Sequence, residues 1–169
     1  MATTDLHKYT VVEKLNKMDV DLITITPTIE TSTIDANDVL FNPTAITNAV
    51  AVTDGKAILQ SICLIDQTNT SVDAGVQIDL VFTQDNTNIG TLDAAVSGAD
   101  SVLDGILGIV SISNYVDMIN GQVATKNNIG LVLQGASSSK TVYVAGIIRE
   151  AGTARAADAI DIRLGIVKD

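Results

Sequence analysis

The sequence predicts an all-β fold: an antiparallel, jelly-roll-like β-sandwich with one short helix and an N-terminal arm. Segments of β-favouring residues recur at intervals of roughly 10–20 residues and are separated by turn-rich polar segments. Several of these segments alternate apolar and polar residues, which is typical of a strand with one buried face. Aromatic residues make up only 3% of the chain, so the core is expected to be aliphatic. At this length we expect a single sandwich domain, residues 20–169, preceded by an extension, residues 1–19.

The strands are expected in the following order. Residues 20–29 form the first, which ends near Pro27 because proline is confined to sheet edges and turns. A long loop rich in Thr, Asn and Asp follows, with a short turn or strand at VLFN (39–42) and another short strand at AVAV (49–52). The remaining expected strands are 57–65, 76–83, 107–113, 129–135, 141–149 and 159–167.

The strands at 57–65 and 76–83 form the central pair of the expected fold, joined by a long exposed loop. In the second, Val76, Ile78, Leu80 and Phe82 alternate with Gln77, Asp79, Val81 and Thr83, which predicts one buried face. In the first, both sides are apolar, which predicts cover on both faces. One cover is the partner sheet, and the other is a helix, a loop or another subunit. The two sides are Ile58, Ile62 and Leu64 against Leu59, Cys63 and Ile65.

One segment has the spacing of a helix. Apolar residues within 93–106 recur at helical intervals, and the best part, about 98–106, predicts the single short helix of the domain. Gly105 or Gly108 is the expected end, because glycine commonly terminates helices. Farther on, Asn120 and Gly121 predict a tight turn within an otherwise mixed segment, 114–128.

Residues 1–19 differ from the rest because they are locally basic, with His7 and three lysines. Their apolar residues fall near one face of a possible short helix, although the β-branched residues at 10–12 disfavour that helix. Two interpretations stay open: an arm that reaches a neighbouring molecule, or a frayed terminus. For the arm, the expected partner-binding residues are Leu6, Tyr9, Val12 and Leu15.

No arrangement of residues predicts catalysis. The only histidine, His7, lies in the N-terminal extension, far from the expected core, and the single cysteine, Cys63, is expected to be a small buried hydrophobic residue. The aspartates between positions 66 and 104 do not match the calcium-loop template, since Thr87 and Ile89 occupy two of its ligand positions. We therefore predict no catalytic residue, no cofactor and no metal site, and expect that the chain is not an enzyme. A calcium site between loops that follows no template stays open.

The net charge of −10 and the pI of about 4.3 bear on the partners. A field of this sign repels nucleic acid and anionic membrane surfaces, so neither is expected as a partner. The acidic surface serves solubility or docks onto a basic partner. No stretch approaches the roughly 18 apolar residues of a membrane span, and no signal core is visible. We therefore expect that the chain is made and kept in a reducing cytoplasm, or that it leaves by cell lysis.

The order of several motifs resembles a family of small virion proteins of tailed phages. These motifs include LITITPTIET, ILQSICLIDQTN, VQIDLVFTQDN and the C-terminal AIDIRLGIVKD. The resemblance covers residues 20–169, while the longer, more basic N-terminus and Glu150-Ala151 depart from the family pattern. The matching positions are 26–29, 58–66, 78–82, 99–100, 108–112, 115, 124–125, 130–131, 149, 153, 158 and 164–169.

The resemblance implies a capsid cement or decoration protein: a jelly-roll-like β-sandwich that binds the outside of the phage head and stabilises the assembled shell. The implied partners are the major capsid protein and further copies of the chain, as a dimer or trimer. The implied location is the capsid surface of the virion, after synthesis in the host cytoplasm. The alternative is a tail-associated or receptor-binding adhesin of a phage particle.

Overall fold

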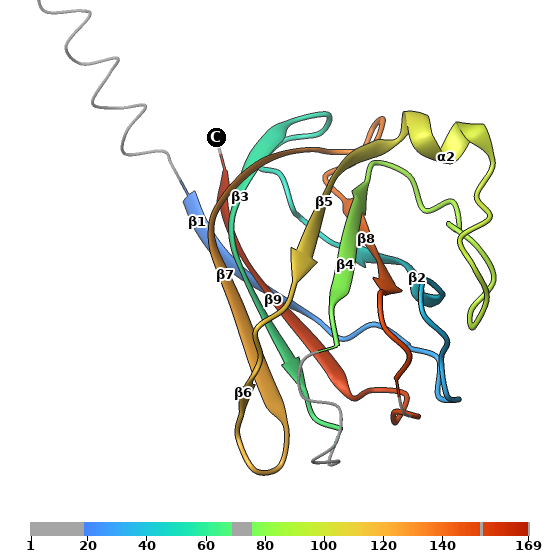
Figure 1. The fold of residues 1–169 in the computed structure, drawn as a ribbon. Coiled ribbons are helices and arrows are strands. Elements are labelled where there is room, and N and C mark those ends of the chain that lie inside the picture. Colours follow the sequence, from blue (N-terminus) through green and yellow to red (C-terminus); the bar gives the residue numbers. More distant parts are fainter. Residues whose placement is uncertain (1–18, 69–75, 153, 169) are drawn as a thin grey trace, which may run out of the picture.

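The computed structural model describes residues 19–68, 76–152 and 154–168. Within these ranges the chain forms two antiparallel sheets that pack face to face (Figure 1). The all-β sandwich with one short helix is therefore confirmed. The strands are β1 (Asp19–Ile25), β2 (Val39–Ile46), β3 (Lys56–Asp66), β4 (Ile78–Thr83), β5 (Ile106–Ile112), β6 (Val116–Asp117), β7 (Gln122–Gln134), β8 (Val142–Ile148) and β9 (Ile160–Lys168), and the helix is α2 (Asp100–Asp104).

The strand order is that of a jelly roll. One sheet runs β1-β9-β3-β7-β6 and the other β2-β8-β4-β5. The first half of the chain pairs with the second half in nested, antiparallel fashion: β1 with β9, β2 with β8, β3 with β7 and β4 with β5. One long hairpin has in effect been rolled into two sheets, which is the jelly-roll arrangement. The two-residue strand β6 adds to one edge through the turn that Asn120 and Gly121 predicted, where the Met118 N–H donates to the Gly121 carbonyl at 2.8 Å.

The space between the sheets is filled mainly by aliphatic side chains, as the composition predicted. Strand β9 shows how the sequence produces this core, because its alternate residues Ile160, Ile162, Leu164 and Ile166 are all fully buried. The two phenylalanines, Phe41 and Phe82, are also fully buried. Burial of apolar surface is worth roughly 25 cal/mol per Å², so this continuous aliphatic layer is the main stabilising feature of the fold.

The central pair does not pair in the structure. Strand β3 lies in the five-stranded sheet between β9 and β7, whereas β4 lies in the four-stranded sheet between β8 and β5. The burial of the two strands also differs from the expected pattern. One face of β3 is buried while Ile58 on the other is 42% exposed, and every residue of β4 is buried. The prediction of one buried face for 76–83 was therefore wrong. At Ile58, no helix or loop of the described residues covers the outer face of β3, and cover by another subunit stays a prediction.

A β-bulge changes which residues of β3 lie on each face. The register with both β7 and β9 shifts between Leu59 and Ser61. An extra residue in one strand inverts the alternation beyond it. Leu59, Ile62 and Leu64 therefore all point inward, although strict alternation places Leu59 on the opposite side. Cys63 consequently lies on the outer face and is half-buried, rather than in the core.

The outer face of β4 is covered by residues 84–105, which include the helix. Val81 packs there in a second apolar cluster with Ile89, Val102, Ala145 and Ile147. The helix that was expected over 98–106 spans only Asp100–Asp104, with Gly105 at its C-terminal end as predicted. Only Val102 of its residues is buried, so one side chain anchors the helix to the sheet.

Three shorter predictions differ from the structure. Residues 49–52 form no strand, because the chain turns there, although Ala49 and Val50 are buried in the core. The expected short strand at 39–42 continues to Ile46 as β2, through Pro43. Proline is tolerated at that position since β2 is an edge strand whose register shifts between Phe41 and Thr44. In addition, β7 begins at Gln122 rather than near 129.

One ion pair lies on the outer face of the four-stranded sheet. The Arg149 Nε donates to Asp79 Oδ2 at 2.6 Å, and the Gln77 amide donates to Asp79 Oδ1 at 3.1 Å. Burial alone would raise the pKa of Asp79. Hydrogen bonds from Ser111, Arg149 and Gln77, together with the charge of Arg149, outweigh that effect and hold this pKa below its ordinary value.

Because the pKa of Asp79 is lowered by folding, its contribution to stability is present above the unfolded pKa of about 3.9 and is lost as the pH falls through the lower folded value. We expect Asp79→Asn to lower the free energy of unfolding by about 1–2 kcal/mol at pH 6. The difference from the unmodified protein should shrink below pH 3. Urea titrations of both proteins at pH 6 and pH 2.5 measure this difference, and a constant difference would contradict the assignment.

Candidate partner-binding surface

The outer face of the five-stranded sheet has an apolar row that crosses four strands. The residues pair directly in the sheet: Val20 with Val167, Val167 with Ile58, and Ile58 with Val132. Side chains opposite each other on one face of adjacent strands lie about 4.5–5.5 Å apart at Cβ, so these four form one continuous surface. Leu22 extends it along β1. We call Val20, Leu22, Ile58, Val132 and Val167 the apolar row.

The apolar row is open to solvent. Val20 and Leu22 are 72% and 70% exposed, and Val132 is 52% exposed. Val167 is half-buried between its neighbours. Single exposed apolar residues are ordinary, but a contiguous group of them usually marks a surface that another molecule covers. The row is therefore a candidate protein interface.

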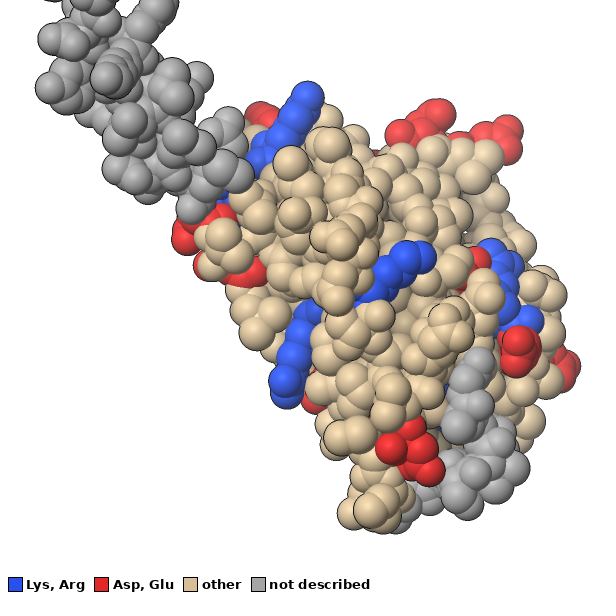
Figure 2. All heavy atoms as spheres, turned by 60° about the vertical axis from the view of Figure 1, so that its left-hand side comes forward, with Lys and Arg blue, Asp and Glu red and all other residues tan. Residues whose placement is uncertain are grey.

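The rest of this sheet face is polar but carries little negative charge. The next rows of paired residues contain Ser61 and Asn127, then Arg163, Cys63 and Thr125. Among the outward-facing described residues of β3 and β9, the charged ones are Lys56, Arg163 and Asp161. Figure 2 shows this side of the molecule as largely uncharged, with a few basic side chains across it and acidic atoms mainly toward its margins.

A face of this kind is unusual in a chain of net charge −10. Self-repulsion of an acidic protein opposes association, and the opposition is weakest where acidic side chains are absent. Asp21, the acidic residue between Val20 and Leu22 on β1, forms an ion pair with Lys168, which reduces its effect on the row. The exposed apolar residues and the scarcity of acidic side chains thus occur on the same face of the sandwich.

The sequence alone did not predict this surface. The residues it did predict to bind a partner, Leu6, Tyr9, Val12 and Leu15, lie outside the described residues. The signal for the row was present in the two-sided apolar pattern of 58–65, which correctly indicated an apolar outer face. The pairing of Val20, Val167 and Val132 with Ile58 was not visible, because these residues are far apart along the chain.

No group of three or more His, Cys, Asp and Glu side chains that could hold a metal ion occurs in residues 19–68, 76–152 and 154–168. The described part of the chain also contains no helix long and apolar enough to cross a membrane. Burial, and then the negative charge of Asp66, raise the pKa of the Tyr115 phenol above its ordinary value.

The fold and this surface together define a jelly-roll domain with a candidate protein interface. No family model matches the chain, and no curated protein matches it. Among solved structures, a virus-like particle of the nodavirus of the giant freshwater prawn Macrobrachium rosenbergii is similar at a TM-score of 0.38 and 9% identity, over 89% of this chain and 92% of that chain.

Two further virus structures are similar to a lesser degree. Desmodium yellow mottle tymovirus matches at a TM-score of 0.28 and 14% identity, over 90% of this chain and 81% of the other. A pentamer of Israel acute paralysis virus matches at a TM-score of 0.31 and 10% identity, over 95% and 92%. At TM-scores this low the likeness carries no argument about function.

Proposed function

We propose that this chain is a virion structural protein, a capsid cement or decoration protein that binds the outside of a phage head and stabilises the assembled shell. The observation that carries the proposal is the apolar row on a sheet face with little negative charge, which suits burial against another protein. The motif resemblance over 20–169 and the jelly-roll topology agree with it. Fold alone does not define function, so the surface is the stronger argument.

The stabilising effect would follow from mass action. A protein that binds the assembled shell, and not its separated subunits, lowers the free energy of the shell. Many copies bind one symmetric shell, and their contributions to its stability add up. The binding free energy of each single contact can therefore be small. Strand β1, at the sheet edge, and the central strands β9 and β3 place the row on a rigid scaffold, which limits the entropy lost on binding.

Cryo-electron microscopy or immunogold labelling of the intact particle tests the proposal most directly. We expect density for the jelly roll on the outer surface of the head. Density on the tail alone would instead support the adhesin alternative, and a particle without the protein would refute both.

A substitution in the apolar row tests which surface binds. We expect Ile58→Lys to lower occupancy on the shell about tenfold or more, because it places a charge at the centre of the contact. Val52→Lys is the matched control, since Val52 is 60% exposed in a turn outside the sheets. Occupancy is measured by co-sedimentation with shells that lack the protein, and thermal melts verify folding. Equal occupancy of the two folded variants would exclude the row as the contact.

A further inference from the structure

A second apolar surface lies on the other side of the sandwich, beside α2. A pocket of about 180 Å³ opens there, lined by apolar side chains and Gly98. Leu103 of the helix is 65% exposed and Ile109 of β5 is 53% exposed, so the pocket has unburied apolar walls. The main lining residues are Val81, Val96, Val102, Leu103, Ile106 and Ile109.

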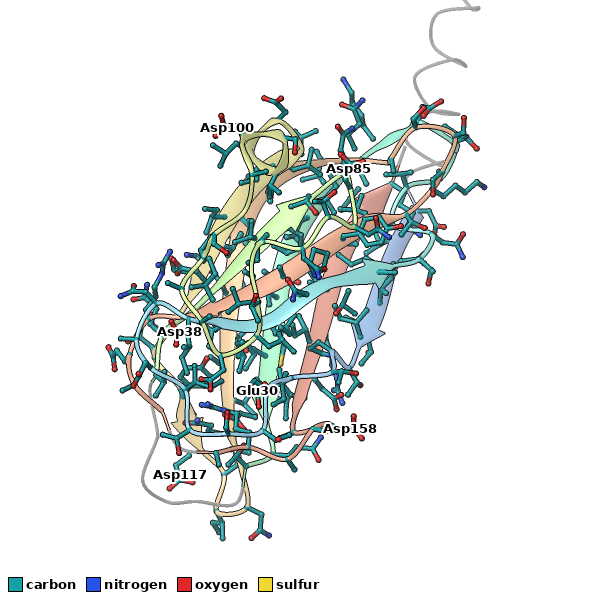
Figure 3. All side chains as sticks on the ribbon, turned by 90° about the vertical axis from the view of Figure 1, so that its right-hand side faces the viewer. Glu30, Asp38, Asp85, Asp100, Asp117 and Asp158 are labelled. Carbon is teal, nitrogen blue, oxygen red and sulfur yellow. The ribbon has the colours of Figure 1, made fainter. Side chains whose placement is uncertain are left out.

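The surroundings of this pocket are acidic. Residues 84–105, which cover the outer face of the four-stranded sheet, contain four exposed aspartates and no lysine or arginine. Asp100 and Asp104 belong to α2, and Asp85 lies next to the helix end, where a Cβ on Gly105 would be 3.1 Å from its Oδ2. Figure 3 shows Asp85 and Asp100 at the same end of the molecule. A ligand that fits here combines apolar side chains with positive charge.

One segment of this chain has that chemistry. Residues 1–18 contain three lysines, Asp5 and Glu13, for a formal charge of +1, so the remainder of the chain carries −10 − 1 = −11. Their apolar residues Leu6, Tyr9, Val12 and Leu15 recur every third position. This is the locally basic and apolar segment of an otherwise acidic protein. Opposite charges favour its approach to the aspartates around the pocket.

Geometry favours the pocket of a neighbouring copy. Residue 19 begins β1 of the five-stranded sheet, whereas the pocket is lined by residues of the four-stranded sheet and of α2. In Figure 1, β1 lies at the left and α2 at the upper right. Sheets pack about 10 Å apart and the α2 layer lies outside the second, so roughly 20 Å separate β1 from the pocket. Four residues span at most about 14 Å, which is too short to bring Leu15 into the pocket of its own chain, so the four apolar residues cannot all bind within one chain.

We propose that residues 1–18 of one copy bind the α2 pocket of a second copy, with Leu6, Tyr9, Val12 and Leu15 as apolar anchors. Lys8 and Lys14 then lie near the aspartates of α2. The contact joins two different surfaces, so it is heterologous. Copies related by such a contact form a closed ring if the rotation between neighbouring copies brings the last one back to the first, and an open filament if it does not. This association uses neither the apolar row nor a shell.

Cross-linking between two different chains tests the proposal on the purified full-length protein. In a Cys63→Ser background, one chain carries Leu15→Cys and a differently tagged chain carries Leu103→Cys. We expect a short bis-maleimide to join them into a hetero-dimer that carries both tags. The matched control replaces Leu103→Cys by Val132→Cys on the opposite sheet, and this pair should cross-link at least about fivefold less, since the two faces lie on opposite sides of the sandwich.

Three results would overturn the proposal: no hetero-dimer, equal cross-linking to Val132→Cys, or a cross-link within one chain when both cysteines are placed together. A second measurement does not depend on cysteine. Sedimentation velocity should show self-association that weakens at least about tenfold on deletion of residues 2–18, and also with Ile109→Lys, which adds a charge to the pocket wall. High salt should weaken it as well, because the attraction is partly electrostatic. Unchanged association of both variants would refute the pocket contact, whether or not the protein binds a virion.

Discussion

Replacing Arg155 by methionine is expected to lower the free energy of unfolding by about 3–5 kcal/mol. The Arg155 Nε donates to Asp66 Oδ2 at 3.2 Å, and both side chains are 2% exposed. Asp66 also accepts from the Thr68 N–H at 2.9 Å and from the Gln122 amide at 3.4 Å. Without the guanidinium, a buried carboxylate loses its countercharge, which costs more than the lost attraction alone.

This ion pair has a large effect because of its position. Asp66 ends β3, and Arg155 lies in the connection between β8 and β9, so the pair fixes that connection to the end of the five-stranded sheet. Thermal melts should show a midpoint roughly 10 °C lower for Arg155→Met. Arg149→Met is the matched control, because the Arg149 side chain is 33% exposed, and its loss should cost about 1–2 kcal/mol.

A double variant separates the charge effect from packing. Adding Asp66→Asn to Arg155→Met removes the unpaired carboxylate, so part of the lost stability should return. If Arg155→Met melts within about 2 °C of the unmodified protein, the pair contributes little and the assignment is wrong.

Gly146→Ala is expected to be the second severe substitution, with a loss of about 3 kcal/mol. A Cβ on Gly146 would lie 2.2 Å from Cε1 and 2.6 Å from Cδ1 of Phe41. Phe41 in β2 pairs with Gly146 in β8 and is fully buried, so its ring has no free space to move into. The glycine is needed here for the close approach of an aromatic ring to the backbone.

Substitution of Phe41 tests whether its ring limits the space at Gly146. Phe41→Leu alone should destabilise by leaving a cavity, but in the Phe41→Leu background Gly146→Ala should cost much less, because the smaller side chain leaves room for the methyl group. Urea unfolding of the four proteins measures the coupling. Additive effects would show that the ring does not limit the space at Gly146.

The fold class and most strands could be predicted because their signals are local. The alternation of Ile160, Ile162, Leu164 and Ile166 identified β9 and its buried face, and the structure confirms both. The turn at Asn120 and Gly121 and the end of the helix at Gly105 were also local signals, and both are confirmed. In each case a few neighbouring residues determine the local conformation.

The errors arose where a distant contact or an extra residue changed the pattern. The bulge after Leu59 inverted the faces of β3, and residues 84–105 covered the face of β4 at Val81 that was expected to be exposed. The nested pairing separated two strands that are adjacent in sequence into different sheets. Periodicity within one segment contains no information about any of these.

By itself the sequence determined an aliphatic, all-β fold, its acidic charge and a basic, apolar N-terminal segment, because composition and alternation are properties of the chain. The tertiary structure alone decided which apolar residues remain on the surface. Val20, Ile58, Val132 and Val167 come from four separate strands, and only hydrogen-bonded pairing places them in one row. A binding surface built across a sheet depends on strand order and register, which are set by contacts between residues far apart in sequence.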